Sequence, residues 1–331
     1  MSAAPLLEVR NQTKHFPMQT GLFGRVSAKV HAVNGVSFTV DRGETVAIVG
    51  ESGCGKSTVG KAILRLFDLT DGEVLLDGRR IDNLPTRVLR PLRRKVQVVF
   101  QDPFSSLNPR LRVRDILAEP IRNFGLASSS QDLERRLVSL MEKVRLPVDS
   151  LGRWPHEFSG GQRQRIGIAR ALAAEPDLII CDEAVSALDV SVKAQIINLL
   201  QDLQRELGLA LLFISHDLAI VEHISQRIIV MYLGRIVEQA DKRTLFLSPS
   251  HPYTEALLSA VPVPDPTVAS RRIILTGDVP SPVKPPSGCF FHTRCPHAEA
   301  RCRAEVPALV EVAPRQFAAC HLRAAMALPA P

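Results

Sequence analysis

The sequence predicts an α/β protein built on a mostly parallel sheet. Short runs rich in valine and isoleucine have the length and composition of buried strands, and helix-length stretches lie between them. A glycine-rich turn joins the first of these strands to the first of these helices. Alternating strands and helices favour a parallel sheet, and such sheets bind ligands at the carboxyl ends of their strands.

The expected elements appear in this order along the chain. Strands are expected at Thr45–Val49, Val96–Phe100, Leu178–Cys181 and Leu211–Ile214, and helices at Lys56–Leu66, Gln131–Val144 and Ser191–Leu207. The segment from about 102 to 158 has scattered serine, proline and arginine and no strong strand pattern, which predicts an inserted helical subdomain.

Composition limits the class of protein. The chain has 331 residues, 45% hydrophobic and 23% charged, which is ordinary for a protein with a sizeable core. It lacks any apolar run of about 18 residues and any cationic start followed by an apolar region, so we expect neither a membrane span nor a signal peptide. The net charge of +7 is mild and does not indicate nucleic-acid binding.

A second, smaller module is expected after the α/β core. Nine of the 24 prolines fall between Pro249 and Pro286, which predicts a mostly extended linker. Four of the six cysteines follow in the last stretch of the chain. We therefore expect one domain over residues 1–246 and a proline-linked cysteine module over 247–331.

The turn after the first expected strand has the pattern of a phosphate-binding loop. It reads Gly50-Glu51-Ser52-Gly53-Cys54-Gly55-Lys56-Ser57-Thr58 and fits G-x-x-x-x-G-K-S/T between a strand and a helix. Backbone N–H groups of such a loop, together with the helix N-terminus, suit a polyphosphate. We expect Lys56 to reach the terminal phosphates and the Ser57 hydroxyl to bind Mg²⁺.

A pair of carboxylates ends the third expected strand. Asp182 comes at the end of the apolar run Leu178–Cys181, and Glu183 follows it. We expect Asp182 to hold the Mg²⁺ shell and Glu183 to act as general base toward a water. The alternative is an acidic turn with no catalytic or metal-binding role, and the presence of the phosphate loop in the same chain makes it less favoured.

A second possible anion site comes earlier, at Ser159-Gly160-Gly161-Gln162, which opens a basic helix. With the phosphate loop and the carboxylate pair, this turn makes the sequence strongly resemble the ATP-binding subunits of ABC transporters over roughly residues 6–245. Within that resemblance, the turn is similar to the family's signature motif. Phe158 stands where that family usually has leucine, and Ala184 where many members have proline. The resemblance implies a P-loop NTPase (RecA-like) core with the ABC helical subdomain, and ATP and Mg²⁺ as ligands.

The resemblance also implies roles for single residues. Gln101 is similar to the Q-loop glutamine, which senses Mg²⁺ and water and faces the membrane partner. Asp189 ends a segment similar to the D-loop, which crosses a dimer interface, and His216 is similar to the switch histidine at the γ-phosphate. Phe16 is placed like the aromatic that stacks on adenine, with ordinary packing as its alternative, and an insertion-like stretch, Met18–Ser27, follows it.

The C-terminal region narrows the resemblance to one branch. Residues 250–258 and 285–296 resemble the C-terminal extension of ATPases from oligopeptide and dipeptide importers, whose relatives serve peptides, nickel and glutathione. The cysteines Cys289, Cys295, Cys302 and Cys320 are spaced C-x5-C-x6-C-x17-C, unlike a zinc ribbon. The branch implies a 4Fe–4S cluster here. Zinc with help from histidines, or four reduced cysteines without metal, are the alternatives; the histidines are His292, His297 and His321.

The function implied is an ATP-hydrolysing motor subunit of an importer for di- or oligopeptides. The resemblance implies a second, related ABC ATPase in a heterodimer, two transmembrane permease subunits and an extracytoplasmic solute-binding protein. It places the chain peripherally on the cytoplasmic face of the inner membrane. Nickel or glutathione uptake is the alternative, and a soluble non-transport ABC ATPase is a further one.

Overall fold

The structure, a computed structural model, describes residues 4–20, 25–102, 104–261 and 272–324. By its internal contacts the chain divides into two compact units, and each is described by itself. The first comprises residues 1–7, 40–45 and 76–214, and the second comprises residues 8–39, 46–75 and 215–331.

The first unit contains three neighbouring parallel strands: β6 (Val96–Val99), β7 (Leu178–Asp182) and β8 (Ala210–Ile214). Every residue of β7 and β8 is buried. The register pairs Val99 with Cys181 and Asp182 with Ile214. Because the strands are parallel and in register, the residues that follow them come out at one edge of the sheet.

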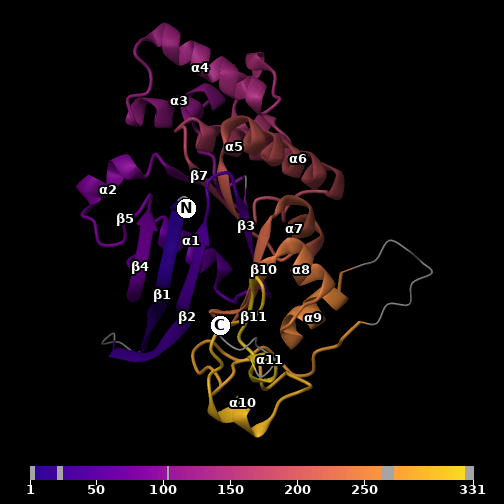
Figure 1. Cartoon of the computed structure of the whole chain (residues 1–331). Helices are drawn as coiled ribbons and strands as arrows, with labels where there is room; N and C mark the ends of the chain where they lie inside the picture. Colours follow the sequence, from indigo (N-terminus) through magenta and orange to yellow (C-terminus); the bar gives the residue numbers. More distant parts are fainter. Residues whose placement is uncertain (1–3, 21–24, 103, 262–271, 325–331) are drawn as a thin grey trace, which may run out of the picture. The chain divides into compact units, whose positions relative to one another are not determined.

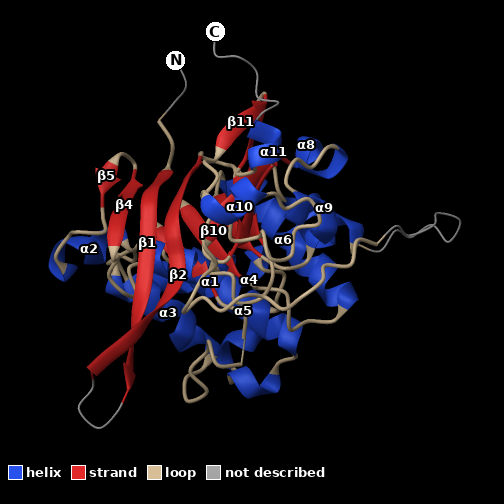
Figure 2. Cartoon of the chain, turned by 90° about the horizontal axis from the view of Figure 1, so that it is seen from below, coloured by secondary structure: helices blue, strands red, loops and turns tan. Residues whose placement is uncertain are grey.

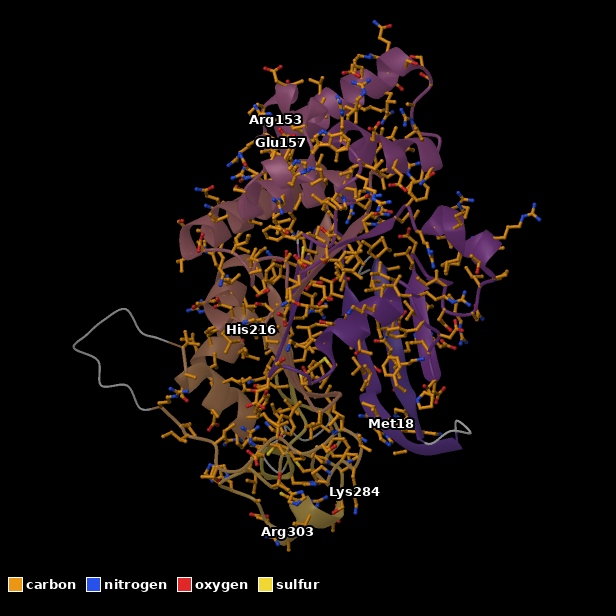
Figure 3. The ribbon with its side chains drawn as sticks, turned by 180° about the vertical axis from the view of Figure 1, so that it is seen from behind. Met18, Arg153, Glu157, His216, Lys284 and Arg303 are labelled. Carbon is orange, nitrogen blue, oxygen red and sulfur yellow. The ribbon has the colours of Figure 1, made fainter. Side chains whose placement is uncertain are left out.

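Helices make up most of the rest of the first unit. Figure 1 shows α3 (Val113–Asn123), α4 (Ser130–Lys143) and α5 (Gly160–Leu172) side by side, and all three pack on one another. The unit also contains β5 (Arg79–Arg80), α2 (Thr86–Leu92), η1 (Val148–Gly152), η2 (Pro155–Glu157) and α6 (Val190–Leu207). Arg153 and Glu157, labelled in Figure 3, lie close together between α4 and α5 along the chain. The described residues between 102 and 158 are thus helical or irregular.

The second unit contains strands of two sheets. Figure 2 shows β1 (Leu7–Thr20), β2 (Arg25–Val40) and β4 (Asp71–Leu76) as neighbours, in the order β2-β1-β4. The other group has the order β11-β12-β10-β9-β3, where β3 and β9 are parallel and the remaining pairs are antiparallel. Its strands are β3 (Thr45–Val49), β9 (Arg227–Tyr232), β10 (Arg235–Asp241), β11 (Val310–Ala313) and β12 (Gln316–Ala318).

Short helices complete the second unit. They are α1 (Lys56–Ile63), α7 (Leu218–Ile224), α8 (Lys242–Leu247), α9 (Pro252–Ser259), α10 (Ala300–Ala304) and α11 (His321–Ala324). Among the described residues, none of the helices has the length and hydropathy that a bilayer span requires. Residues 262–271, which include part of the expected proline-rich linker, and residues 21–24 of the expected insertion lie outside the described residues.

The predicted element boundaries differ from the observed ones by a few residues, for local reasons. The helix expected over Lys56–Leu66 ends at Ile63, because Arg65 takes up a left-handed backbone conformation with φ of 49°. The helix expected over Gln131–Val144 begins one residue earlier, because the Ser129 side chain accepts a hydrogen bond from the Asp132 N–H as its N-cap.

Candidate functional site

The phosphate-loop motif of the second unit runs from β3 into α1, as predicted. Gly50, Gly53 and Gly55 have φ of 148°, 79° and 104°, conformations that L-residues rarely adopt. A Cβ at Gly50 would collide with the carbonyl oxygen of Met231, and one at Gly55 with that of Ala32. The loop therefore follows a path that requires glycine at both positions.

Lys56 lies inside this loop. Only 4% of it is exposed, and its Nζ donates hydrogen bonds to the carbonyl oxygens of Gly50 at 2.8 Å and Glu51 at 2.9 Å. The Cys54 thiol is buried beside Lys56, and burial raises its pKa. Lys56, Ser57 and Thr58 begin α1 after the N-cap Gly55, which has no side chain to cap the helix. The first N–H groups of any α-helix point away from its own carbonyl oxygens, so this end of α1 can offer N–H groups to an anion.

Two further residues with predicted roles belong to the second unit. His216 follows β8, is exposed, and lines a cavity of about 300 Å³ with Leu257 and Val261 (Figure 3 labels the histidine). Phe16 on β1 is half-buried, packs edge-on against Phe67 with ring centroids 5.2 Å apart, and has the Lys14 ammonium 5.0 Å from its ring centroid.

The carboxylate pair belongs to the first unit. Asp182 ends β7 and is 7% exposed. Glu183 is half-buried and has a left-handed φ of 50°, and its N–H donates to the Ile214 carbonyl at 3.0 Å. A left-handed conformation outside glycine is unusual and costs energy, so the fold holds Glu183 in a defined place after the strand. Gln101 follows β6 and comes out at the same edge, where it is exposed.

The Ser159–Gln162 turn is the N-terminus of α5. The Ser159 hydroxyl accepts from the Gln162 N–H at 3.3 Å, and the Gln162 side chain accepts from the Ser159 N–H at 3.0 Å, which forms a capping box. Ser159 and Gln162 are exposed, and Gly161 is packed so closely against Val192 that a Cβ there would collide with it. Asp189 is exposed at the start of α6, followed by Val190 with 84% exposure.

Sequence reasoning assigned no role to Gln164, which links two of these motifs inside the first unit. Its buried side chain donates to the Phe100 carbonyl, directly before Gln101, at 3.3 Å. On the same helix, the guanidinium of Arg163 lies 4.1 Å from the ring centroid of Phe104, and Arg170 donates to the Ser106 carbonyl. Helix α5 therefore holds the segment that carries Gln101.

The four C-terminal cysteines are free thiols in one module. The N–H of Cys289 donates to the Cys302 carbonyl at 2.8 Å. Burial raises the pKa of Cys289 to about 11, with smaller contributions from the charges of the other three cysteines. Among the described residues, however, no group of three or more His, Cys, Asp or Glu side chains is arranged to hold a metal ion. The structure therefore supports neither the iron–sulfur nor the zinc expectation.

Comparison with known proteins decides the family. The family model described as ABC transporter matches residues 33–186, and the model described as Oligopeptide/dipeptide transporter, C-terminal region, matches residues 237–302. The chain is 57% identical over 319 residues to a probable peptide ABC transporter ATP-binding protein of Sinorhizobium fredii, covering 96% of this chain and 90% of that protein. The chain belongs to the ATP-binding subunits of the oligopeptide/dipeptide ABC transporter family.

Other relatives of this ABC subunit agree. The oligopeptide transport ATP-binding protein AppF of Bacillus subtilis is 52% identical over 320 residues, covering 96% of this chain and 97% of AppF. A dimeric post-hydrolysis structure of the ATP-binding cassette MJ0796 with ADP and Pi is similar with a TM-score of 0.64 and 30% identity, covering 72% of this chain and 99% of that one. The cassette cbiO1 of Clostridium perfringens gives a TM-score of 0.63 and 26% identity, covering 74% and 91%. The subunit is thus an ABC-type ATPase with a mixed α/β fold, as predicted.

Proposed function

We propose that this ABC subunit hydrolyses ATP to energise the import of di- or oligopeptides. The observation that carries the proposal is the match of nearly the whole chain to AppF, an oligopeptide transport ATP-binding protein. The separate match of residues 237–302 to the oligopeptide/dipeptide C-terminal region supports the same branch. We keep residues 1–246 as the proposed ATPase domain, with its helical subdomain at about 102–158, and 247–331 as the extension.

The proposed mechanism uses the residues described above. The amides of residues 50–58 and the start of α1 bind the phosphates, and Lys56 moves from loop carbonyls to the terminal phosphates. The oxygen donors that would hold Mg²⁺ are Ser57, Gln101 and the buried Asp182, and the ion would supply neutralisation of the charge that develops on the phosphates. Glu183 accepts a proton from the attacking water as general base, and His216 contacts the γ-phosphate.

Two copies of such a site require a partner. Ser159, Gly160, Gly161 and Gln162 of this chain, of which Ser159 and Gln162 are exposed, close over the ATP of a second, related ATPase, and the exposed Asp189 faces the interface. The helix N-terminus at Ser159 supplies N–H groups for that partner's nucleotide. We propose a heterodimer that docks peripherally on two permease subunits at the cytoplasmic face of the inner membrane and receives solute from an extracytoplasmic binding protein. Phe16 is the proposed adenine-stacking residue.

The test is uptake by the assembled transporter in vesicles, with ATP inside and the solute-binding protein outside. We expect uptake of labelled di- and oligopeptides that depends on ATP. Uptake of nickel or glutathione in place of peptides would correct the solute but keep the motor role. ATP hydrolysis with no association with permease subunits would contradict the transport function and favour a soluble ABC ATPase.

The cysteine module carries a separate prediction. We propose that Cys289, Cys295, Cys302 and Cys320 bind a 4Fe–4S cluster, on the support of four cysteines in one small module. Binding would require the side chains to rearrange, because no three of the described metal-ligand side chains converge in the structure. Protein purified without oxygen should then be brown and contain iron and acid-labile sulfide, and Cys302→Ser should lose both. Colourless protein with stoichiometric zinc, or without metal, would contradict the cluster.

A further inference from the structure

Glu51, the residue after the first glycine of the phosphate loop, is fixed at three points. Its carboxylate accepts two hydrogen bonds from the Arg294 guanidinium, at 2.8 and 3.1 Å. Its N–H donates to the Tyr253 hydroxyl at 2.8 Å, and its carbonyl accepts from Lys56 at 2.9 Å. Two of these three partners come from the C-terminal extension, about 200 residues and more away in sequence.

Arg294 is itself held firmly. Its side chain is only 8% exposed, and its guanidinium lies 6.0 Å from the ring centroid of Tyr232. Tyr232 packs on Tyr253 and Phe291 with ring centroids 4.8 and 5.3 Å apart, and all three rings are buried. The carboxylate of Glu51 raises the pKa of Arg294, which therefore stays charged. A bidentate pair on a packed aromatic base has a defined geometry, unlike a mobile surface ion pair.

The charge of Glu51 explains what this contact does. A carboxylate within a loop that binds polyphosphate repels the ligand unless a cation neutralises it. Arg294 supplies that cation, and its two parallel hydrogen bonds also fix the direction of the Glu51 side chain. Tyr253 fixes the backbone of the same residue. The neighbouring Gly50 and Lys56 are thereby held in the shape described above.

We propose that Arg294 is a positioning residue for ATP binding, which acts through Glu51 and makes the C-terminal extension part of the nucleotide site's support. The inference rests on the proposed role of the phosphate loop. It requires that the contact serve the affinity for ATP rather than only the stability of the extension. Removing the arginine then leaves a partly buried, uncompensated carboxylate in the loop.

The experiment measures ATP binding by the full chain and ATP hydrolysis by the assembled transporter. We expect Arg294→Ala to raise the Kd and KM for ATP roughly tenfold, with kcat changed less than twofold, about what losing a charge-assisted contact costs. We expect Arg294→Ala combined with Glu51→Gln to recover most of the loss, because the repelling charge is gone. Arg301→Ala is the matched control. Arg301 lies in the same module and forms an exposed ion pair with Glu305, with 2.9 Å between Nε and Oε2.

The outcomes separate the possibilities. The inference would be overturned if the double variant bound ATP no more tightly than Arg294→Ala, or if Arg294→Ala had the Kd of the parent. Either result would leave the proposed function standing. A parent protein that binds no ATP would instead overturn the proposed function on which the inference rests. If Arg294→Ala does not fold, Arg294→Lys keeps the charge with fewer donors. Arg294→Lys should raise the Kd for ATP about threefold, and adding Glu51→Gln to it should return the Kd toward the parental value. An Arg294→Lys variant with the parental Kd would overturn the inference.

Discussion

Replacing Glu183 with glutamine is expected to stop ATP turnover in the assembled transporter while ATP binding persists. Glutamine has nearly the same shape, so the hydrogen bond from the residue 183 N–H to the Ile214 carbonyl is kept. The amide cannot accept the proton of the attacking water, and loss of a general base lowers kcat by about 100-fold or more. The measurement is steady-state ATP hydrolysis together with the amount of ATP retained after gel filtration.

Glu175→Gln is the matched control for this prediction. Glu175 also has a left-handed φ, of 52°, and lies in the same unit, but its carboxylate pairs with Arg94 and Arg136 at the surface. Surface pairs contribute little, so the control should hydrolyse ATP at nearly the parental rate. Hydrolysis by Glu183→Gln at the parental rate would show that Glu183 is not the base.

Gly55→Ala is expected to destroy ATP binding and to lower stability even without nucleotide. Its Cβ would collide with the Ala32 carbonyl oxygen, and its φ of 104° is unfavourable for alanine. Backbone cannot move away as a flexible side chain can, so we expect a loss of several kcal/mol, on the order of 3 kcal/mol. Chemical unfolding of the nucleotide-free chain and ATP titration measure the two effects.

Gly53→Ala separates the collision from the backbone strain. Gly53 lies in the same loop with φ of 79°, but, apart from its two chain neighbours, no atom of the described residues lies within 4 Å of its Cβ position. Only the cost of the left-handed conformation remains, about 1–2 kcal/mol. Equal destabilisation by the two variants would contradict the explanation that the approach of Ala32 makes glycine necessary at position 55.

The buried parallel strands could be predicted closely from the sequence. β3 has the predicted bounds, and β7 and β8 differ by one residue each, because strands buried on both faces leave continuous apolar runs. The long strands β1 and β2 were not predicted, since β1 mixes polar residues and a proline and has no such run. β9 (Arg227–Tyr232), which is apolar and buried after Arg227, had the same signal as β3 and could have been found.

The candidate site likewise has parts that could be predicted from the sequence and parts that could not. Motifs that are contiguous in sequence, such as residues 50–58 or 159–162, can be recognised from the sequence because their local geometry needs particular residue types. The contacts of Glu51 with Tyr253 and Arg294 join residues 202 and 243 positions apart. The spacing of residues in the sequence does not indicate which distant segments meet in the fold. Tyr253 and Arg294 therefore lay within recognised motifs, but the sequence alone assigned them no role. Gln164 was missed for the same reason.

The two carbonyl oxygens that hold Lys56 also set a threshold for ligands. To serve a nucleotide, the ammonium must give up the carbonyls of Gly50 and Glu51, two neutral acceptors in a buried place. Only a ligand that offers several anionic oxygens in return can make that exchange favourable, because charge-assisted bonds are about twice as strong as neutral ones. A nucleoside monophosphate, whose single phosphate reaches less of the loop, gains less from the exchange. We therefore expect the loop to favour a nucleoside triphosphate over a monophosphate, whichever base the nucleotide carries.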